Sequence, residues 1–190
     1  MLTVLMVMLM MTVLGIGALT VSGLENNIAG LQRTTESAAQ AAESGLGTSA
    51  NVLLQTLLPE NGNEIPAALL SPVGLVPVGN KLVFEGEIIG NPENLNDVPI
   101  GSGAAPNISM SVGAYAVACD VDRLYVKMKA GSGQQQFAAY DGAGVGAGAG
   151  GVDVFYKIDC VGSNIATGTE SRVTAIYACA LTGDGCIKQP

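Results

Sequence analysis

The chain of 190 residues contains no histidine and no tryptophan, and basic side chains are scarce. Without histidine it lacks the base of a Ser–His–Asp triad, a ligand of most zinc sites and the axial ligand of His-ligated haem. Only 8 lysines and arginines stand against 16 aspartates and glutamates, so the formal net charge is −8. Nucleic-acid-binding proteins need a basic surface, and this composition argues against that class.

Charged residues of both signs make up only 13% of the sequence, against about 25% in an average soluble domain. The shortage is greatest at the N-terminus, where no charged side chain precedes Glu25. Crossing the hydrocarbon core of a bilayer takes about 20 apolar residues in a helix. Residues 1–24 meet that requirement, so the sequence predicts one domain preceded by a transmembrane segment.

Three interpretations of this apolar segment compete: a cleavable signal peptide, a signal anchor, and a mature N-terminus from which a basic leader has been removed. A signal peptide begins with basic residues and ends at a small-residue cleavage site, and a signal anchor usually has flanking basic residues. Here the first basic residue is Arg33. We favour the third interpretation, in which Met1 is the processed N-terminus.

The helical pattern continues beyond the apolar segment. Residues 24–58 contain no proline, are rich in alanine, leucine, glutamine and glutamate, and carry a modest apolar stripe, and Pro59 marks the end. We therefore predict one helix over residues 1–57, about 85 Å long at 1.5 Å per residue. Its first half is apolar on every side and its second half is amphipathic.

A helix that is apolar on every side must lie in lipid or among other such helices. Small residues let helices approach closely, and the alternative is a single-pass anchor in which the same residues face lipid. We favour helix–helix packing, because the helix extends about 30 residues beyond a bilayer. The small positions are Thr3, Thr12, Gly15, Gly17, Ala18 and Thr20. Gly15, Gly17 and Gly23 are also positions where the helix could bend or unwind.

Residues 58–190 predict a β-rich head with one core, and the whole chain an α+β fold in which one antiparallel sheet packs on the C-terminal half of the helix. Recurrent prolines predict mostly loop over 59–107, and Asp120–Asp122 predicts a tight turn. The run 151–161 alternates between two faces, one with Val152, Val154, Tyr156 and Ile158 and the other with Asp153, Phe155, Lys157 and Asp159. The strand-like runs are 81–89, 111–119, 123–130, 151–161 and 171–181.

All four cysteines lie in the head, and an even number on a translocated domain predicts two disulfides with three conceivable connectivities. Cys119 and Cys160 each end a strand-like run, whereas Cys179 and Cys186 flank a short loop, so we favour these two pairs. A metal site is not predicted, because neither a CxxC pair nor histidine occurs. The absence of CxxCH also excludes c-type haem.

Other candidate sites carry little chemistry. A formal GxGxxG at Gly146, Gly148 and Gly151 leads into a strand-like run and not a helix, so we expect a loop. Asn107-Ile108-Ser109 is a glycosylation sequon that we interpret as incidental. The aspartates match no EF-hand spacing, and we expect solvated turn residues and no calcium site; they are Asp120, Asp122, Asp153, Asp159 and Asp184. No nucleophile–base pair emerges, so we predict a non-enzyme without a cofactor.

Two patches of the sequence resemble a known family. TVLG at 12–15, LE at 24–25, AG at 29–30, Arg33 and QAAE at 40–43 are similar to the N-terminal pattern of PilX-type pilus assembly proteins, a branch of the type IV pilin superfamily. YKI at 156–158 and SRVTAIYA at 171–178 resemble that family's closing β-hairpin. The resemblance leaves residues 59–150 uncovered.

The resemblance implies a pilin-like fold and a structural subunit of an extracellular filament. It also implies maturation at the inner membrane by a prepilin peptidase, a methylated N-terminus, and assembly with copies of itself or other pilins by the pilus machinery. The alternatives are a minor pilin that primes assembly or sits at the tip, and a membrane-anchored adhesin. Leu5 stands where most pilins have glutamate, a departure that the PilX-type branch shares. The expected assembly residues are Met1, Leu5, Thr12, Gly15, Gly17 and Glu25.

Overall fold

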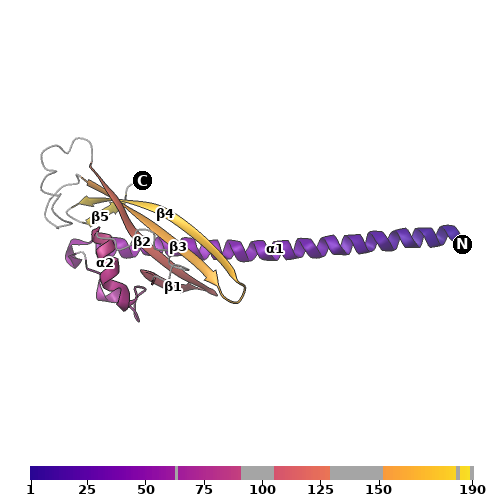
Figure 1. The fold of residues 1–190 in the computed structure, drawn as a ribbon, viewed down its shortest axis with the longest axis horizontal. Helices are drawn as coiled ribbons and strands as arrows, with labels where there is room; N and C mark the ends of the chain where they lie inside the picture. The colour runs from indigo at the N-terminus through magenta and orange to yellow at the C-terminus, as the bar shows by residue number, and fades with distance from the viewer. Residues whose placement is uncertain (63, 91–104, 129–151, 183–184, 189–190) are drawn as a thin grey trace. The chain divides into compact units, whose positions relative to one another are not determined.

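The computed structural model describes residues 1–62, 64–90, 105–128, 152–182 and 185–188. Its regular elements are helix α1 (Leu2–Thr56), three short 3-10 helices (Pro59–Asn61, Ala67–Leu69 and Val78–Asn80), helix α2 (Lys81–Ile89), and strands β1 (Ile108–Val112), β2 (Tyr115–Met128), β3 (Val152–Asn164), β4 (Thr169–Thr182) and β5 (Gly185–Lys188). The strands form one antiparallel sheet in the order β1-β2-β3-β4-β5 (Figure 1). The predicted α+β fold is confirmed.

Helix α1 runs without a break from Leu2 to Thr56, close to the predicted bounds of 1–57. The chain divides into two compact units within this helix, Met1–Ser37 and Ala38–Pro190, and each is described separately below. The predicted boundary of the head, at residue 58, therefore falls later than the point at which the helix joins the compact unit. The reason is that residues 38–56 pack on the sheet.

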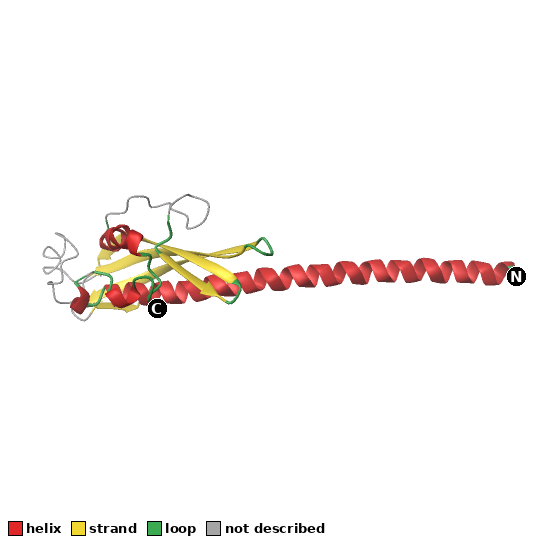
Figure 2. Ribbon diagram, turned by 90° about the horizontal axis from the view of Figure 1, so that it is seen from below, coloured by secondary structure: helices red, strands yellow, loops and turns green. Residues whose placement is uncertain are grey.

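The packed part of α1 presents small residues to the sheet, and Figure 2 shows this part running along the strands. Ala38, Ala41, Ala42, Gly45 and Ser49 are buried, at the spacing of one helical face. They are followed by Val52, Leu53 and Thr56, which are also buried. A face of small side chains lets the backbone of the helix lie close to the sheet.

Two glycines mark the closest approach, one on each side of the contact. A Cβ on Gly45 would lie 2.7 Å from Val117 Cγ1 and 2.8 Å from Cys119 Sγ. A Cβ on Gly162 of β3 would lie 2.6 Å from the carbonyl oxygen of Ala38. Neither position has room for a side chain, so glycine is required at both. We call this contact, formed by residues 38–49 of α1 with Cys119, Cys160 and Gly162, the helix seat.

The helix seat leads to a first prediction. Gly45→Ala should lower the free energy of unfolding by about 1–3 kcal/mol, because the new methyl group overpacks a filled interface. Gly47→Ala is the matched control, since a methyl group on Gly47 of the same helix would meet nothing within 4 Å. Both variants gain the same helix propensity, so the difference between their thermal midpoints isolates the steric clash. Equal midpoints would contradict the close approach.

Residues 81–89, predicted as a strand, form helix α2, and the prediction was wrong. The β-branched and aromatic content of the run favoured a strand, but burial follows helical spacing, with Phe84 and Ile88 in the core. Gly90 ends the helix in the left-handed conformation, with φ 102°, and its N–H donates to the carbonyls of Gly86 and Glu87. Elsewhere in 59–107, the described residues include only the three short 3-10 helices as regular structure.

The turn predicted at Asp120–Asp122 is also wrong, because these residues lie inside β2. Val121 continues the buried face of the strand, and the two aspartates lie on the opposite face. The register of β2 against β3 instead shifts between Arg123 and Tyr125. Beyond that shift the strands remain paired to their ends, where Met128 stands opposite Val152.

The remaining strand predictions hold only in part. Residues 152–161 lie in β3 and 171–181 in β4, as predicted, whereas the run 111–119 spans the turn at 113–114 between β1 and β2. Residues 123–128 continue β2 and do not form a separate strand. In β3, Val154, Tyr156 and Ile158 are buried, as the alternation predicted. β3 and β4 form the expected hairpin, paired from Asp153–Ala180 to Asn164–Thr169. The GxGxxG segment at 142–151 and Asp184 lie outside the described residues, so the predictions made for them are untested.

Candidate assembly surface on the N-terminal helix

The unit Met1–Ser37 is a helix, and its large apolar side chains pack against nothing else within that unit. Every large apolar side chain from Met1 to Leu31 is more than half exposed. They lie on all sides of the helix, because apolar residues are nearly continuous between Leu2 and Leu14. Apolar surface of this kind is unstable in water, so the segment requires lipid or other helices around it.

Helix α1 is long and apolar enough to cross a membrane, with a mean hydropathy of 2.4 over its most apolar window. This window lies near the N-terminus and is not buried within the structure. The predicted transmembrane segment is thus confirmed in its length and composition. Membrane anchoring is consistent with this finding.

Two of the hydroxyl groups in the apolar segment, those of Thr12 and Thr20, are satisfied within the helix. Thr12 Oγ1 donates to the Leu9 carbonyl and Thr20 Oγ1 to the Gly17 carbonyl, both at 2.8 Å. These internal bonds remove the need for water at the two side chains. The segment can therefore leave water without stranding these hydroxyls.

All six expected assembly residues lie in the unit Met1–Ser37, five of them on α1 and Met1 directly before it, and none of them is buried within that unit. Met1, Leu5 and Glu25 are exposed. A methyl group added to Gly15 or Gly17 would meet no described atom within 4 Å beyond the adjoining helix backbone. Their role in contacts between subunits remains a prediction, and within the unit Met1–Ser37 the surface they share is exposed.

The helix becomes polar just before it joins the head. Gln32 Nε2 donates to Glu36 Oε1 one turn further along, at 2.9 Å. Arg33, the first basic residue of the chain, lies between them and is exposed. This change from apolar to polar surface marks where the helix can leave an apolar environment.

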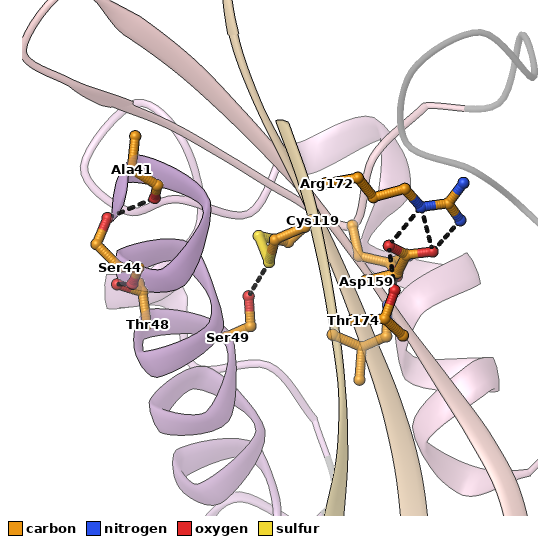
Figure 3. The surroundings of a disulfide bond; sticks show 11 residues. Ala41, Ser44, Thr48, Ser49, Cys119, Asp159, Arg172 and Thr174 are labelled. Carbon is orange, nitrogen blue, oxygen red and sulfur yellow. Dashed lines mark hydrogen bonds and ion pairs between the residues drawn. A yellow bond between two sulfur atoms is a disulfide. The ribbon is translucent and has the colours of Figure 1, made fainter. Parts of the chain in front are cut away.

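Both favoured disulfide pairings are confirmed, Cys119–Cys160 and Cys179–Cys186. Cys119 and Cys160 are directly opposite one another on β2 and β3, and both are fully buried. Ser49 Oγ approaches Cys160 Sγ to 3.9 Å from the helix side (Figure 3). The second bridge joins β4 to the short β5, so the two disulfides tie four of the five strands.

An ionic cluster that the sequence did not reveal lies on the sheet face opposite α1. Arg172 donates from Nε to both carboxylate oxygens of Asp159, at 2.8 and 3.0 Å, and also from its terminal nitrogen. Thr174 Oγ1 donates to the same carboxylate at 3.1 Å (Figure 3). Lys157 lies 3.9 Å from Asp159 and 3.4 Å from Asp122. The only sequence signal was the Arg-x-Thr spacing on a predicted strand.

The electrostatics of Asp159 favour its charged form. Burial raises the pKa of this carboxyl, but the hydrogen bonds from Arg172 and Thr174, with the charges of Arg172 and Lys157, outweigh it and leave the pKa below its usual value. Asp120, Asp122 and Asp159 are buried on strands, and Asp153 is half-buried in β3, so the expectation of solvated turn residues was wrong for these four. Among the described residues, no group of three or more metal-ligating side chains occurs.

Helix α2 is anchored to the sheet at its C-terminal end. Tyr156 Oη donates to the Ile88 carbonyl at 3.2 Å, and Arg123 donates to the Ile89 carbonyl. Donors suit this position, because the last carbonyls of a helix lack partners and carry partial negative charge. Burial raises the pKa of the Tyr156 hydroxyl to about 12, although the charge of Arg123 opposes this shift.

Asn107, the acceptor residue of the glycosylation sequon, has a structural role. It is 2% exposed, its Nδ2 donates to Glu87 Oε2 at 2.7 Å, and its Oδ1 accepts from the Val121 N–H at 2.7 Å. The amide thus links α2 to the edge of β2 beyond the end of β1. Since the nitrogen that glycosylation would modify is buried and bonded, the sequon is not available in the folded chain.

Comparison with known proteins finds no matching family model, no similar curated protein and no similar solved structure. Function therefore has to be argued from the residues and geometry described above.

Proposed function

We propose that this chain is a structural subunit of a type IV pilus-like extracellular filament and polymerises through residues 1–31 of α1. The observation that carries the proposal is the exposure of every large apolar side chain from Met1 to Leu31. The same helix continues into a domain held by two disulfides, through residues 38–56. One end suits an apolar filament core and the other suits the outside of a cell.

The length of α1 supports a role beyond anchoring. A bilayer accounts for about 20 residues, whereas the unit that precedes the packed segment extends from Met1 to Ser37. Satisfied hydroxyls at Thr12 and Thr20 and open positions at Gly15 and Gly17 suit close packing between helices. The pilin-like fold and the similarity to PilX-type sequences agree with this role.

The partners follow from the same proposal. Before assembly the apolar segment is held in the inner membrane, where a prepilin peptidase and the pilus machinery act on it. Afterwards it packs against other copies or other pilins, with the acidic head on the filament surface. The chain performs no catalysis in this role, and its head contacts set the surface properties of the filament.

A membrane-anchored binding module is the second candidate, because the apolar segment has the length and hydropathy of a single membrane span. In that role the same side chains face lipid, and no polymer forms. A minor pilin that primes assembly or sits at the tip is a variant of the first role. Abundance in filaments separates all three.

Electron microscopy of material sheared from the cell surface, with intact-mass spectrometry of the same fraction, tests the proposal. Thin filaments composed mainly of a chain that begins at a methylated Met1 are expected. Filaments that hold this chain only in traces would assign it the minor or tip role. Its retention in membranes and absence from filaments would overturn the proposal in favour of the anchored module.

A further inference from the structure

The Cys119–Cys160 bridge forms the sheet side of the helix seat, directly under residues 38–49 of α1. Cys119 and Cys160 have no exposed surface. A methyl group on Gly45 would lie 2.8 Å from Cys119 Sγ and 3.3 Å from Cys160 Sγ, and Ser49 Oγ lies 3.9 Å from Cys160 Sγ. The face of α1 around Gly45 therefore covers both sulfurs.

The Cys179–Cys186 bridge is less enclosed. Cys186 is only partly buried, although Cys179 is fully buried. It lies on β5, which pairs only with the end of β4 from Cys179 to Thr182. The two disulfides of this chain thus differ in how accessible their sulfur atoms are to thiols in solution.

Access decides whether a disulfide can form or break. A thiolate must reach one sulfur, bond to it and expel the other sulfur as a thiolate. The second thiol of the reductant then attacks the mixed disulfide and releases the remaining cysteine as a thiolate. Two electrons thus pass to the bridge, and the reductant becomes a disulfide. Formation is the reverse, with the two electrons passing to an oxidised disulfide of a thiol oxidoreductase. Neither reaction can proceed at a sulfur that α1 covers.

We infer that residues 38–56 of α1 shield Cys119–Cys160 from thiols, so that this bridge forms and breaks only when that segment locally leaves the sheet. Oxidation consequently precedes docking of the helix, and docking then protects the bridge from reductants. Cys179–Cys186 stays open to exchange in the docked state. This inference does not depend on the filament proposal.

The rates at which the two disulfides are reduced test whether α1 shields Cys119–Cys160. The full oxidised chain in mild detergent is treated with dithiothreitol, quenched with N-ethylmaleimide, and its cysteine peptides are quantified by mass spectrometry. Cys179 and Cys186 should be labelled at least tenfold faster than Cys119 and Cys160. Gly45→Ala should speed labelling of Cys119 and Cys160 at least tenfold, whereas Gly47→Ala should not. Equal rates at the two bridges of the unmodified chain would overturn the inference.

Two further variants separate local undocking from global unfolding. Gly162→Ala weakens the helix seat from the strand side, where the methyl group would lie 2.6 Å from the Ala38 carbonyl oxygen. It should act as Gly45→Ala does, and it replaces that variant should Gly45→Ala fail to fold. Arg172→Ala weakens the opposite face of the sheet and should leave the labelling of Cys119 and Cys160 within threefold. If Arg172→Ala speeds labelling of Cys119 and Cys160 as much as Gly45→Ala does, the bridge opens by global unfolding. That result would overturn the inference.

Discussion

Gly15→Leu and Gly17→Leu should each reduce filament abundance at least tenfold while leaving the amount of folded chain in membranes unchanged. Beyond the adjoining helix backbone, no described atom would lie within 4 Å of a Cβ at either position, so a single subunit has room for the new side chain. Leucine also favours helix over glycine by about 1 kcal/mol. Any loss of filaments therefore reflects contacts with other subunits, where bulk prevents close helix packing.

Sheared filaments and membrane-retained chain are quantified separately by immunoblot in the same cells. Gly15→Ala is the graded control, because it raises helix propensity yet keeps the residue small, and it should retain filaments. Gly47→Leu tests a second exposed glycine of the helix outside the apolar segment. Normal filament abundance in both leucine variants would contradict packing through this segment and would favour a lipid-facing anchor.

Arg172→Ala should lower the free energy of unfolding by about 3 kcal/mol at pH 7, because it leaves the buried Asp159 carboxylate without its bidentate partner. Thermal unfolding of the full chain in mild detergent measures this effect. Arg33→Ala is the control, since Arg33 is exposed on the helix and no salt bridge is formed by it among the described residues. Similar midpoints for the two variants would contradict a stabilising role for the pair.

The effect of Arg172→Ala should also depend on pH. The pKa of Asp159 is lower in the folded chain than in the unfolded chain, so on acidification the unfolded chain takes up the proton first. The stability from ionised Asp159 is therefore complete above its unfolded pKa of about 4 and is lost as pH falls through its folded pKa. The gap in the free energy of unfolding between the unmodified chain and the variant should narrow from pH 7 to pH 2. A constant gap would show that Arg172 stabilises by packing alone.

The features that the sequence predicted well are those that depend on neighbouring residues. A charge-free run before Glu25 and the absence of proline before Pro59 are enough to predict α1. The Cys179–Cys186 pair follows from two cysteines that flank a short loop, and strand β3 follows from alternation in residues 151–161. In each case the physical cause lies within a short stretch of chain.

The features that sequence analysis missed depend on residues that are far apart along the chain. Asp120 and Asp122 resembled a turn because the lysine and arginine of the cluster lie on other strands. Residues 81–89 resemble a strand in composition, but they form a helix because helical spacing buries both Phe84 and Ile88 in the core. Helical spacing places Gly45, and not Gly47, on the packed face of α1, but no local signal shows that Gly45 faces a sulfur atom.

The pairing of Met128 with Val152 has a consequence for the entropy of closing the chain between them. It holds the two ends of the intervening sequence side by side on adjacent strands, with the Cys119–Cys160 bridge further along the same pair. Doubling the length of such a connection costs only about 0.6 kcal/mol of closure entropy. The free energy of pairing Met128 with Val152 is therefore only weakly sensitive to the number of residues between them.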